Sequence, residues 1–350
     1  MSKTRLQLAA AVAAMGILAM PAAASAAQGP GAPTTVPGVG ALSGVACPTA
    51  TTCVSVGDDG NFNGKSAVIN AATGAVKAWS GDLAASGTLN AVACPGTKSC
   101  VAVADDTVAS VMASSGAMKV TATPPPPTNG IVALSTIACA SSTRCYATGF
   151  EGSPSAPTAT VVSLSAAGKL LATKQNSGKG IAAIACPSVT LCLMGENYSS
   201  GLTIQLLNNG KFGKMHPLPA NTFIAAIACF KASVCYALGG KSTSSPQLAD
   251  ELFPLNPATG AVGTMATIGG SFNGASLSCL NATTCLAAGF TESGSTIKNA
   301  AVAIVNGKPG TPKNYAGTFG LRSVACASAS RCYAVGPSSS GTAIVDKVTS

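Results

Sequence analysis

Cysteine is the residue type whose spacing in this 350-residue chain most clearly indicates chemistry. All fourteen cysteines fall into seven C-x5-C pairs, and the first cysteines recur every 43 to 50 residues. The pairs are Cys47/Cys53, Cys94/Cys100, Cys139/Cys145, Cys186/Cys192, Cys229/Cys235, Cys279/Cys285 and Cys326/Cys332. Structural zinc sites usually show closer spacings such as C-x2-C. The even number and uniform spacing therefore favour seven disulfides over metal binding, each within its own repeat.

Carboxylates are the second group with chemical potential. Seven of the eleven acidic residues stand four to seven positions after the second cysteine of a repeat. They are Asp58, Asp59, Asp105, Asp106, Glu151, Glu196 and Glu292. Paired carboxylates can hydrolyse glycosides, and a ring of them could bind a cation, an amine or sugar hydroxyls. Ordinary solvated loop charges are the alternative, because loops are where charges must go.

Basic residues favour other loops. Four lie between or beside the paired cysteines (Lys98, Arg144, Lys231, Arg331), and six lie near Gly-containing turns (Lys77, Lys119, Lys169, Lys211, Lys214, Lys308). The sorting by sign predicts one acidic face and one basic face. The basic face is a candidate contact for an anionic envelope polymer. Nucleic acid is not expected as a partner, because arginines are few and no aromatics are interleaved with them.

No catalytic signature accompanies these charges. The only histidine, His216, precedes a proline and is expected in an exposed loop. Neither a metal nor a cofactor is expected, and enzymatic activity is left open with a leaning towards none.

The elements that position these residues form a repeat. An apolar residue stands two positions before each first cysteine, and another stands five before it in every repeat except the sixth, which has Gly274. Each unit is expected to hold two strands joined by the cysteine hairpin, a third strand, a tight glycine turn and a fourth strand. Four strands in a repeat of about 46 residues are typical of a propeller blade. The sequence therefore predicts an all-β, seven-bladed β-propeller of four-stranded antiparallel blades.

The two ends of the chain complement each other. The seventh repeat ends after its third strand, at residues 343–345, and residues 33–39 stand where other repeats have a fourth strand. We expect this N-terminal strand to complete the last blade. A linear β-array would not explain the matching incomplete ends.

A targeting segment is expected at the N-terminus. Lys3 and Arg5 precede an apolar stretch over residues 6–20, and an A-x-A site follows at residues 24–26. That order is typical of a secretory signal peptide over residues 1–26, with the propeller over residues 27–350. The mature protein is expected to be secreted or extracytoplasmic, without a transmembrane segment, and a monomer.

The repeat L-x-x-V-A-C-P-x4-C-V-x-V-G, seen at residues 42–57, resembles the Cys-Pro-type repeats of exported bacterial β-propellers. It is also similar to BNR/Asp-box and photosystem-assembly-factor-type propellers. Ala72 stands where the Asp-box aspartate would fall, and the mature chain keeps only three arginines. The resemblance therefore implies the fold and does not imply sialidase activity.

Two functions remain open on the sequence. The first is a non-catalytic binding or scaffold propeller with an unknown protein or glycan partner, acting at the cell envelope. The second is a carbohydrate-active enzyme, a glycoside hydrolase or lyase, that uses the acidic face.

Overall fold

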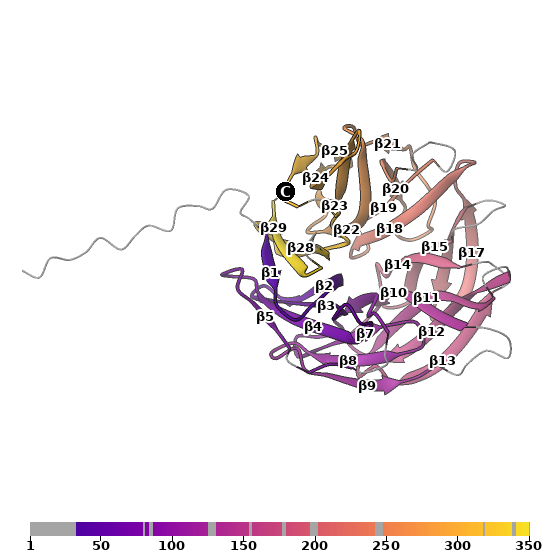
Figure 1. The fold of residues 1–350 in the computed structure, drawn as a ribbon. Helices are drawn as coiled ribbons and strands as arrows, with labels where there is room; N and C mark the ends of the chain where they lie inside the picture. Colours follow the sequence, from indigo (N-terminus) through magenta and orange to yellow (C-terminus); the bar gives the residue numbers. More distant parts are fainter. Residues whose placement is uncertain are drawn as a thin grey trace, which may run out of the picture.

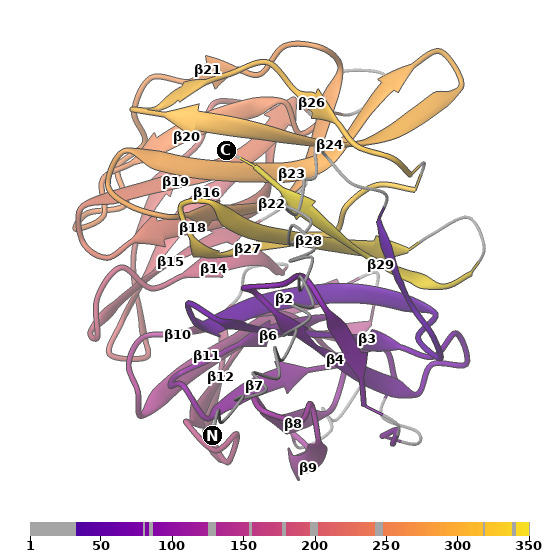
Figure 2. The same cartoon turned by 90° about the vertical axis from the view of Figure 1, so that its left-hand side faces the viewer.

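The computed structural model describes residues 33–79, 81–83, 87–124, 131–153, 156–176, 180–196, 202–241, 248–317, 319–337 and 341–349. In this part of the chain every regular element is a strand, and the strands form seven antiparallel sheets. The sheets stand as blades around a central axis (Figure 1; the view from the side is Figure 2). The expected signal peptide, residues 1–26, lies outside the described residues.

Each blade has an inner, a second, a third and an outer strand. The inner strands are β2 (Ala41–Thr49), β6 (Ala91–Ala93), β10 (Ile131–Cys139), β14 (Ile181–Ala185), β18 (Thr222–Phe230), β22 (Phe272–Cys279) and β27 (Ser323–Ser328). The second strands are β3 (Thr52–Asp58), β7 (Ser99–Val103), β11 (Arg144–Ser153), β15 (Leu191–Glu196), β19 (Val234–Lys241), β23 (Thr284–Ser293) and β28 (Arg331–Pro337).

The third strands are β4 (Gly64–Asn70), β8 (Val108–Met112), β12 (Ala156–Ser165), β16 (Thr203–Asn208), β20 (Glu251–Leu255), β24 (Thr296–Val305) and β29 (Ala343–Val348). The outer strands are β5 (Val76–Ala78), β9 (Met118–Ala122), β13 (Leu170–Asn176), β17 (Lys211–Pro217), β21 (Ala266–Thr267), β25 (Lys308–Pro309) and, in blade 7, β1 (Thr34–Val36). A further short strand, β26 (Lys313–Asn314), also pairs with β24. His216 lies in outer strand β17, half-buried and opposite Ile204, so the expected exposed loop was wrong.

The N-terminal strand closes the ring as expected. Strand β1 pairs antiparallel with β29, with Thr34 opposite Val345 and Val36 opposite Ala343. The Ala343 amide also donates to the Val39 carbonyl at 2.8 Å. Figure 1 shows the indigo start of the described chain beside its yellow end. The closure joins the first and last blades and protects their strand edges.

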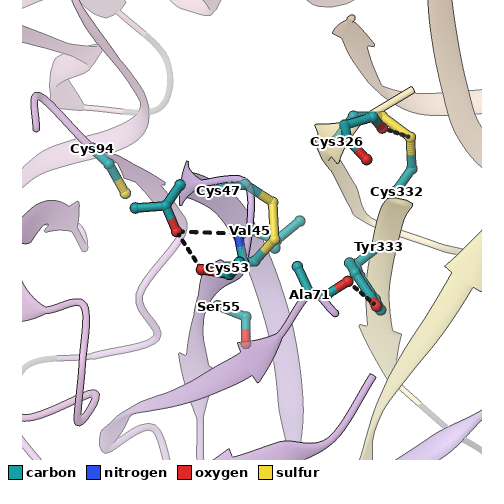
Figure 3. The surroundings of a disulfide bond; sticks show 12 residues. Val45, Cys47, Cys53, Ser55, Ala71, Cys94, Cys326, Cys332 and Tyr333 are labelled. Atoms are coloured by element: carbon teal, nitrogen blue, oxygen red, sulfur yellow. Dashed lines mark hydrogen bonds between the residues drawn. A yellow bond between two sulfur atoms is a disulfide. The ribbon is translucent and has the colours of Figure 1, made fainter. Parts of the chain in front are cut away.

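All fourteen cysteines are paired as the spacing predicts. Each disulfide joins the inner and second strands of one blade, with Cα atoms 3.8 to 4.1 Å apart. In blade 3, Cys139 lies directly opposite Cys145 in the strand register. Figure 3 shows the disulfides of blades 1 and 7, Cys47–Cys53 and Cys326–Cys332, on neighbouring hairpins. The disulfides therefore belong to the packed frame.

The hydrophobic core is divided among the seven interfaces between neighbouring blades. Each apolar cluster combines side chains of two adjacent blades; one, for example, joins Val54 and Val56 of blade 1 to Leu89 and Val92 of blade 2. At the closure, the Tyr333 hydroxyl of blade 7 donates to the Ala71 carbonyl of blade 1 at 3.1 Å (Figure 3). Each blade thus needs its neighbours to bury its faces.

The exception at Gly274 has a packing reason. The apolar residue five before the first cysteine is at most 2 % exposed in the other six blades. In blade 6, fully buried Phe272 occupies this space, and a Cβ on Gly274 would collide with Leu238 of blade 5. An aromatic ring two residues earlier therefore replaces the missing leucine.

Candidate functional site

A narrow channel runs along the propeller axis. Three consecutive residues of each blade's inner strand region line it, and its volume is about 250 Å³. The lining triplets are residues 43–45, 90–92, 135–137, 182–184, 225–227, 275–277 and 322–324. The first residue of each triplet stands four positions before the first cysteine of its repeat. These seven first residues form a ring, which we call the channel ring: Ser43, Asn90, Ser135, Ala182, Ala225, Ala275 and Arg322.

A β-bulge places the channel ring. In blade 1, Leu42 lies opposite Gly57 and Gly44 opposite Val56, so Ser43 between them has no partner on the second strand. The same one-residue shift occurs in blades 3 to 6. In blades 2 and 7 the ring residue precedes the inner strand, and the Asn90 and Arg322 amides donate to second-strand carbonyls at 2.7 Å. A bulge redirects the side chain that it leaves unpaired, and here it does so at the channel.

The channel ring is chemically lopsided. Its four polar members, Arg322, Ser43, Asn90 and Ser135, come from the consecutive blades 7, 1, 2 and 3, and we call them the polar arc. The other three members, Ala182, Ala225 and Ala275, come from blades 4, 5 and 6 and form the alanine arc. Among the described residues that line the channel, Arg322 is the charged one. The seven blades therefore surround a channel whose ring has polar side chains on one side and alanine side chains on the other.

Polar side chains at the channel also connect neighbouring blades. The Asn90 amide donates to the Leu134 carbonyl of blade 3 at 2.9 Å, and the Ser135 hydroxyl donates to the Ile181 carbonyl of blade 4 at 3.3 Å. One position later, Ser323 accepts from the Val45 amide at 3.1 Å. Ser276 of blade 6 accepts from the Val324 amide in the same way. These bonds satisfy backbone groups on the inner edge of the ring.

The paired cysteines, first among the candidates from the sequence, form no accessible site. The second member of each pair is buried at 0 to 1 % exposure, in all seven blades: Cys53, Cys100, Cys145, Cys192, Cys235, Cys285 and Cys332. The first members are half-buried, and no cysteine in the chain is free. A ligand cannot reach the buried sulfurs, and a disulfide has no thiolate to attack a substrate or bind a metal. The cysteines therefore position the inner and second strands and are not part of a binding surface.

The seven acidic residues named from the sequence lie away from the channel wall. Each stands at, or just beyond, the end of a second strand, and in an antiparallel blade these ends share one face of the ring. None of them lines the channel wall, and a ligand site formed by them around the mouth of the channel stays a prediction. In the described part of the chain, Asp105 is the member of this set that forms a side-chain hydrogen bond with the channel ring, accepting from Asn90 at 3.4 Å.

The carboxylates of blade 1 organise their own loop. Asp58 accepts hydrogen bonds from the Gly60 amide at 2.7 Å and from the Thr88 hydroxyl, on the connection to blade 2, at 3.1 Å. Asp59 accepts from the Asn63 side-chain amide at 3.0 Å and from the Asn61 amide at 2.8 Å. These bonds, the Asn63 side chain first, lower the pKa of Asp59 to about 2. Both groups therefore act as loop caps.

The remaining members are dispersed over four blades. Asp106 is exposed and accepts from the Thr107 hydroxyl, whereas Glu151 is buried and accepts from Thr160 at 3.3 Å. Glu292 is half-buried and lines a separate cavity of about 390 Å³ beside Lys298 and Asn314. Among the described residues no three His, Cys, Asp or Glu side chains are grouped to hold a metal ion.

Glu196 departs from the repeat. Five blades have a glycine at its position, four after the second cysteine, and in blade 3 a Cβ on Gly149 would collide with the Ala133 carbonyl oxygen. Glu196 is only 2 % exposed, and its Oε2 accepts from Thr203 at 3.0 Å. In the described part of the chain its Oε1 has no hydrogen-bond partner. Burial raises the pKa of this carboxyl.

Two further buried carboxylates were missed from the sequence. Asp346 on β29 is 1 % exposed, accepts from Asn299 of blade 6 at 3.4 Å, and has a pKa that burial raises to about 6. Glu251 on β20 is 3 % exposed, and its Oε1 lies 3.7 Å from Lys241 Nζ. Burial raises its pKa, and Lys241 opposes the rise. The signal for Asp346 was visible, because it interrupts the apolar run of a third strand.

The basic residues of the cysteine hairpins lie at the other ends of the second strands. Lys98, Arg144 and Lys231 are exposed there, and Arg331 is half-exposed. A cavity of about 660 Å³ opens beside one hairpin, between Lys98 and Lys119 and next to the exposed Met112. No carboxylate lines this cavity or the channel.

Comparison with known proteins supports the fold. No protein family model matches the chain, and no curated protein matches it. The WD40 β-propeller domain of Doa1 is similar in structure, with a TM-score of 0.62 and 14 % identity over 87 % of this chain and 92 % of that one. The WD40 domain of Neurospora crassa Pan2 is similar as well, with a TM-score of 0.58 and 9 % identity over 88 % of this chain and 90 % of that one. Such low identity shows the fold alone, so the resemblance to BNR/Asp-box propellers stays a prediction.

Proposed function

We propose that the protein is an exported, non-catalytic binding or scaffold propeller. The observation that carries the proposal is a contrast: the frame of each blade is repeated seven times, whereas the residues of the channel ring, half-buried or exposed, differ between blades. A fold that repeats its frame and varies its exposed positions suits recognition, because loops and rims on a rigid scaffold carry binding. The WD40 neighbours support a scaffold or binding role for the same fold.

The disulfides support a location outside the cytoplasm. Seven bonds in one chain are in line with an oxidising compartment, because reducing systems keep cytosolic thiols free. Among the described residues no helix is long and apolar enough to cross a membrane. The leader expected over residues 1–26 supports export, and secretion into a medium with and without these residues tests it.

The basic face is our proposed contact with an anionic envelope polymer. The cysteine hairpins carry the four cations Lys98, Arg144, Lys231 and Arg331. The predicted acidic ends of the second strands lie on the opposite face of the ring. Even the shortest second strand, β7 with 5 residues, is about 17 Å long, which exceeds the Debye length of about 8 Å at physiological salt. The two faces therefore attract partners of opposite charge independently.

Replacing all four hairpin cations by Gln tests this contact. We expect binding to immobilised polyphosphate and polyglutamate to weaken at least about tenfold, because four exposed charges leave one surface. The matched control replaces Lys174, Lys298 and Lys313 by Gln, which removes three positive charges that lie away from the cysteine hairpins. Equal weakening by both variants would show a general charge effect and overturn the assigned face.

The alternative, a glycoside hydrolase or lyase, stays a prediction from the sequence. None of the three cavities described above is lined by two carboxylates, the minimum that acid–base hydrolysis needs. A glycan array followed by product analysis separates the two functions: retained, intact glycans support a binder, and cleaved glycans support the enzyme.

A further inference from the structure

We propose that the channel mouth binds a small hydroxylated organic carboxylate, with Arg322 as the residue that holds the carboxylate. The site is distinct from the basic face, because Arg322 stands before inner strand β27 and lines the axial channel. The proposal adds a ligand class to the binding role above. The two proposals are independent: the carboxylate site at the channel can be wrong while the polymer contact on the basic face is right, and the polymer contact can be wrong while the carboxylate site is right.

Arg322 is available for an external anion. Its side chain is exposed and lines the channel, and its backbone amide is already bonded to the Val335 carbonyl. Within the described residues neither ion pair involves it, since these join Lys65 to Asp82 and Lys241 to Glu251. A guanidinium offers a planar pair of donors that matches a carboxylate. An unpaired arginine in a hollow is therefore a ready anion contact.

The rest of the polar arc suits a hydroxyl next to that carboxylate. Ser43 of the neighbouring blade 1 has no side-chain hydrogen bond in the described part of the chain, so its hydroxyl can donate or accept. The Asn90 amide nitrogen donates to Leu134 and Asp105, which leaves its oxygen free to accept from a ligand hydroxyl. Arg322, Ser43 and Asn90 thus supply donors for an anion and an acceptor for a hydroxyl.

The alanine arc faces this arrangement across the channel. Ala182, Ala225 and Ala275 have no polar side-chain group and are half-buried or exposed at the ring. A ligand that spans the channel therefore meets polar side chains on one side, and backbone groups with small methyl groups on the other. This asymmetry favours an organic acid with a short aliphatic end over inorganic phosphate, which has no apolar part.

The size of the channel limits the ligand. A volume of 250 Å³ holds about eight waters at about 30 Å³ each, which is room for a small acid and not for a polymer. The carboxylates at the second-strand ends share the face on which the channel ring opens. Their repulsion disfavours polyanions, so a singly charged ligand such as lactate is expected to enter.

The test is ligand-observed NMR with the full-length purified protein, using lactate, propionate and inorganic phosphate as probes. We expect saturation transfer to the lactate methyl, and a dissociation constant that rises at least tenfold in Arg322→Gln. Arg322→Lys should lie between, because it keeps the charge and loses the paired donors. Propionate should bind more weakly than lactate, because it lacks the hydroxyl.

The matched control is Arg331→Gln, which removes one arginine from the hairpin face and should leave lactate binding unchanged. Equal losses in both variants, or unchanged binding in Arg322→Gln, would overturn the site. Phosphate binding that exceeds lactate binding and depends on Arg322 would overturn the ligand class. A melting temperature within a few degrees of the wild type shows that each variant is folded.

Discussion

Each inner strand region joins two unlike places, the disulfide hairpin and the channel ring. At the hairpin every blade has the same pair of cysteines, and the second cysteine is buried against the neighbouring blade. Four positions before the first cysteine the blades carry Ser, Asn, Ser, Ala, Ala, Ala and Arg. The hairpin must fit the next blade, whereas the bulged ring residue faces open space. Repetition therefore marks packing, and variation marks the surface that is free to bind.

The comparison predicts that a change in the frame alters stability more than a change at the channel ring does. Three sets of substitutions test this, in order of expected effect.

Asp346 is a polar departure inside the frame, and its replacement should have the largest effect. Burial raises its pKa from 3.8 to about 6, so the folded protein keeps a proton that the unfolded chain releases earlier. Stability from this group therefore falls as pH rises from about 4 to about 6. A shift of about 2 pKa units corresponds to about 3 kcal/mol. Asp346→Asn should raise the unfolding free energy by up to that amount at pH 7.5.

The measurement is urea unfolding of Asp346→Asn at pH 7.5 and pH 3.5. The gain should become small at the lower pH, where the carboxyl is neutral in the folded protein and mostly neutral in the unfolded chain. The control is Asp106→Asn, which changes an exposed carboxylate and should leave the free energy of unfolding nearly unchanged. A gain that is the same at both pH values would show that charge burial is not its cause.

Removing one disulfide should have the next largest effect, and the same effect in different blades. The chain-entropy model gives about 2 kcal/mol for so short a loop. We expect this loss for Cys139→Ser/Cys145→Ser in blade 3 and for Cys229→Ser/Cys235→Ser in blade 5, measured by urea unfolding. Losses that differ widely between the two blades would show that the hairpins are less uniform in energy than in sequence.

A channel-ring change should have the smallest effect. Asn90→Ala removes the hydrogen bond to the Leu134 carbonyl, a net contribution of about 1 kcal/mol. Ala182→Ser changes the equivalent position of the alanine arc and should stay within about 0.5 kcal/mol. Thermal unfolding of both variants checks the pair. If Ala182→Ser lowered the stability as much as the loss of a disulfide does, the channel ring would be part of the packed frame and not a free surface.

Much of the candidate site was within reach of the sequence, and part of it was not. Lining up the repeats places Arg322 at the same position as Ser43 and Asn90, so the variable position could have been found by alignment. Its direction could not, because it depends on a bulge that strand periodicity does not reveal. Charge sorting drew attention to the acidic residues instead, and none of these lines the channel wall.

The sequence alone determined the architecture: seven four-stranded blades, seven local disulfides and closure by the N-terminal strand. These features rest on local spacing, which recurs seven times and so averages out the noise of any single repeat. Tertiary structure decided which side chains share a space. Asp346 meets Asn299 from 47 residues away, and the polar arc joins blade 7 to blades 1, 2 and 3 across the closure. The Asp346–Asn299 contact depends on the packing of blade 7 against blade 6. The polar arc depends on the ring being closed, because only closure brings the last repeat beside the first.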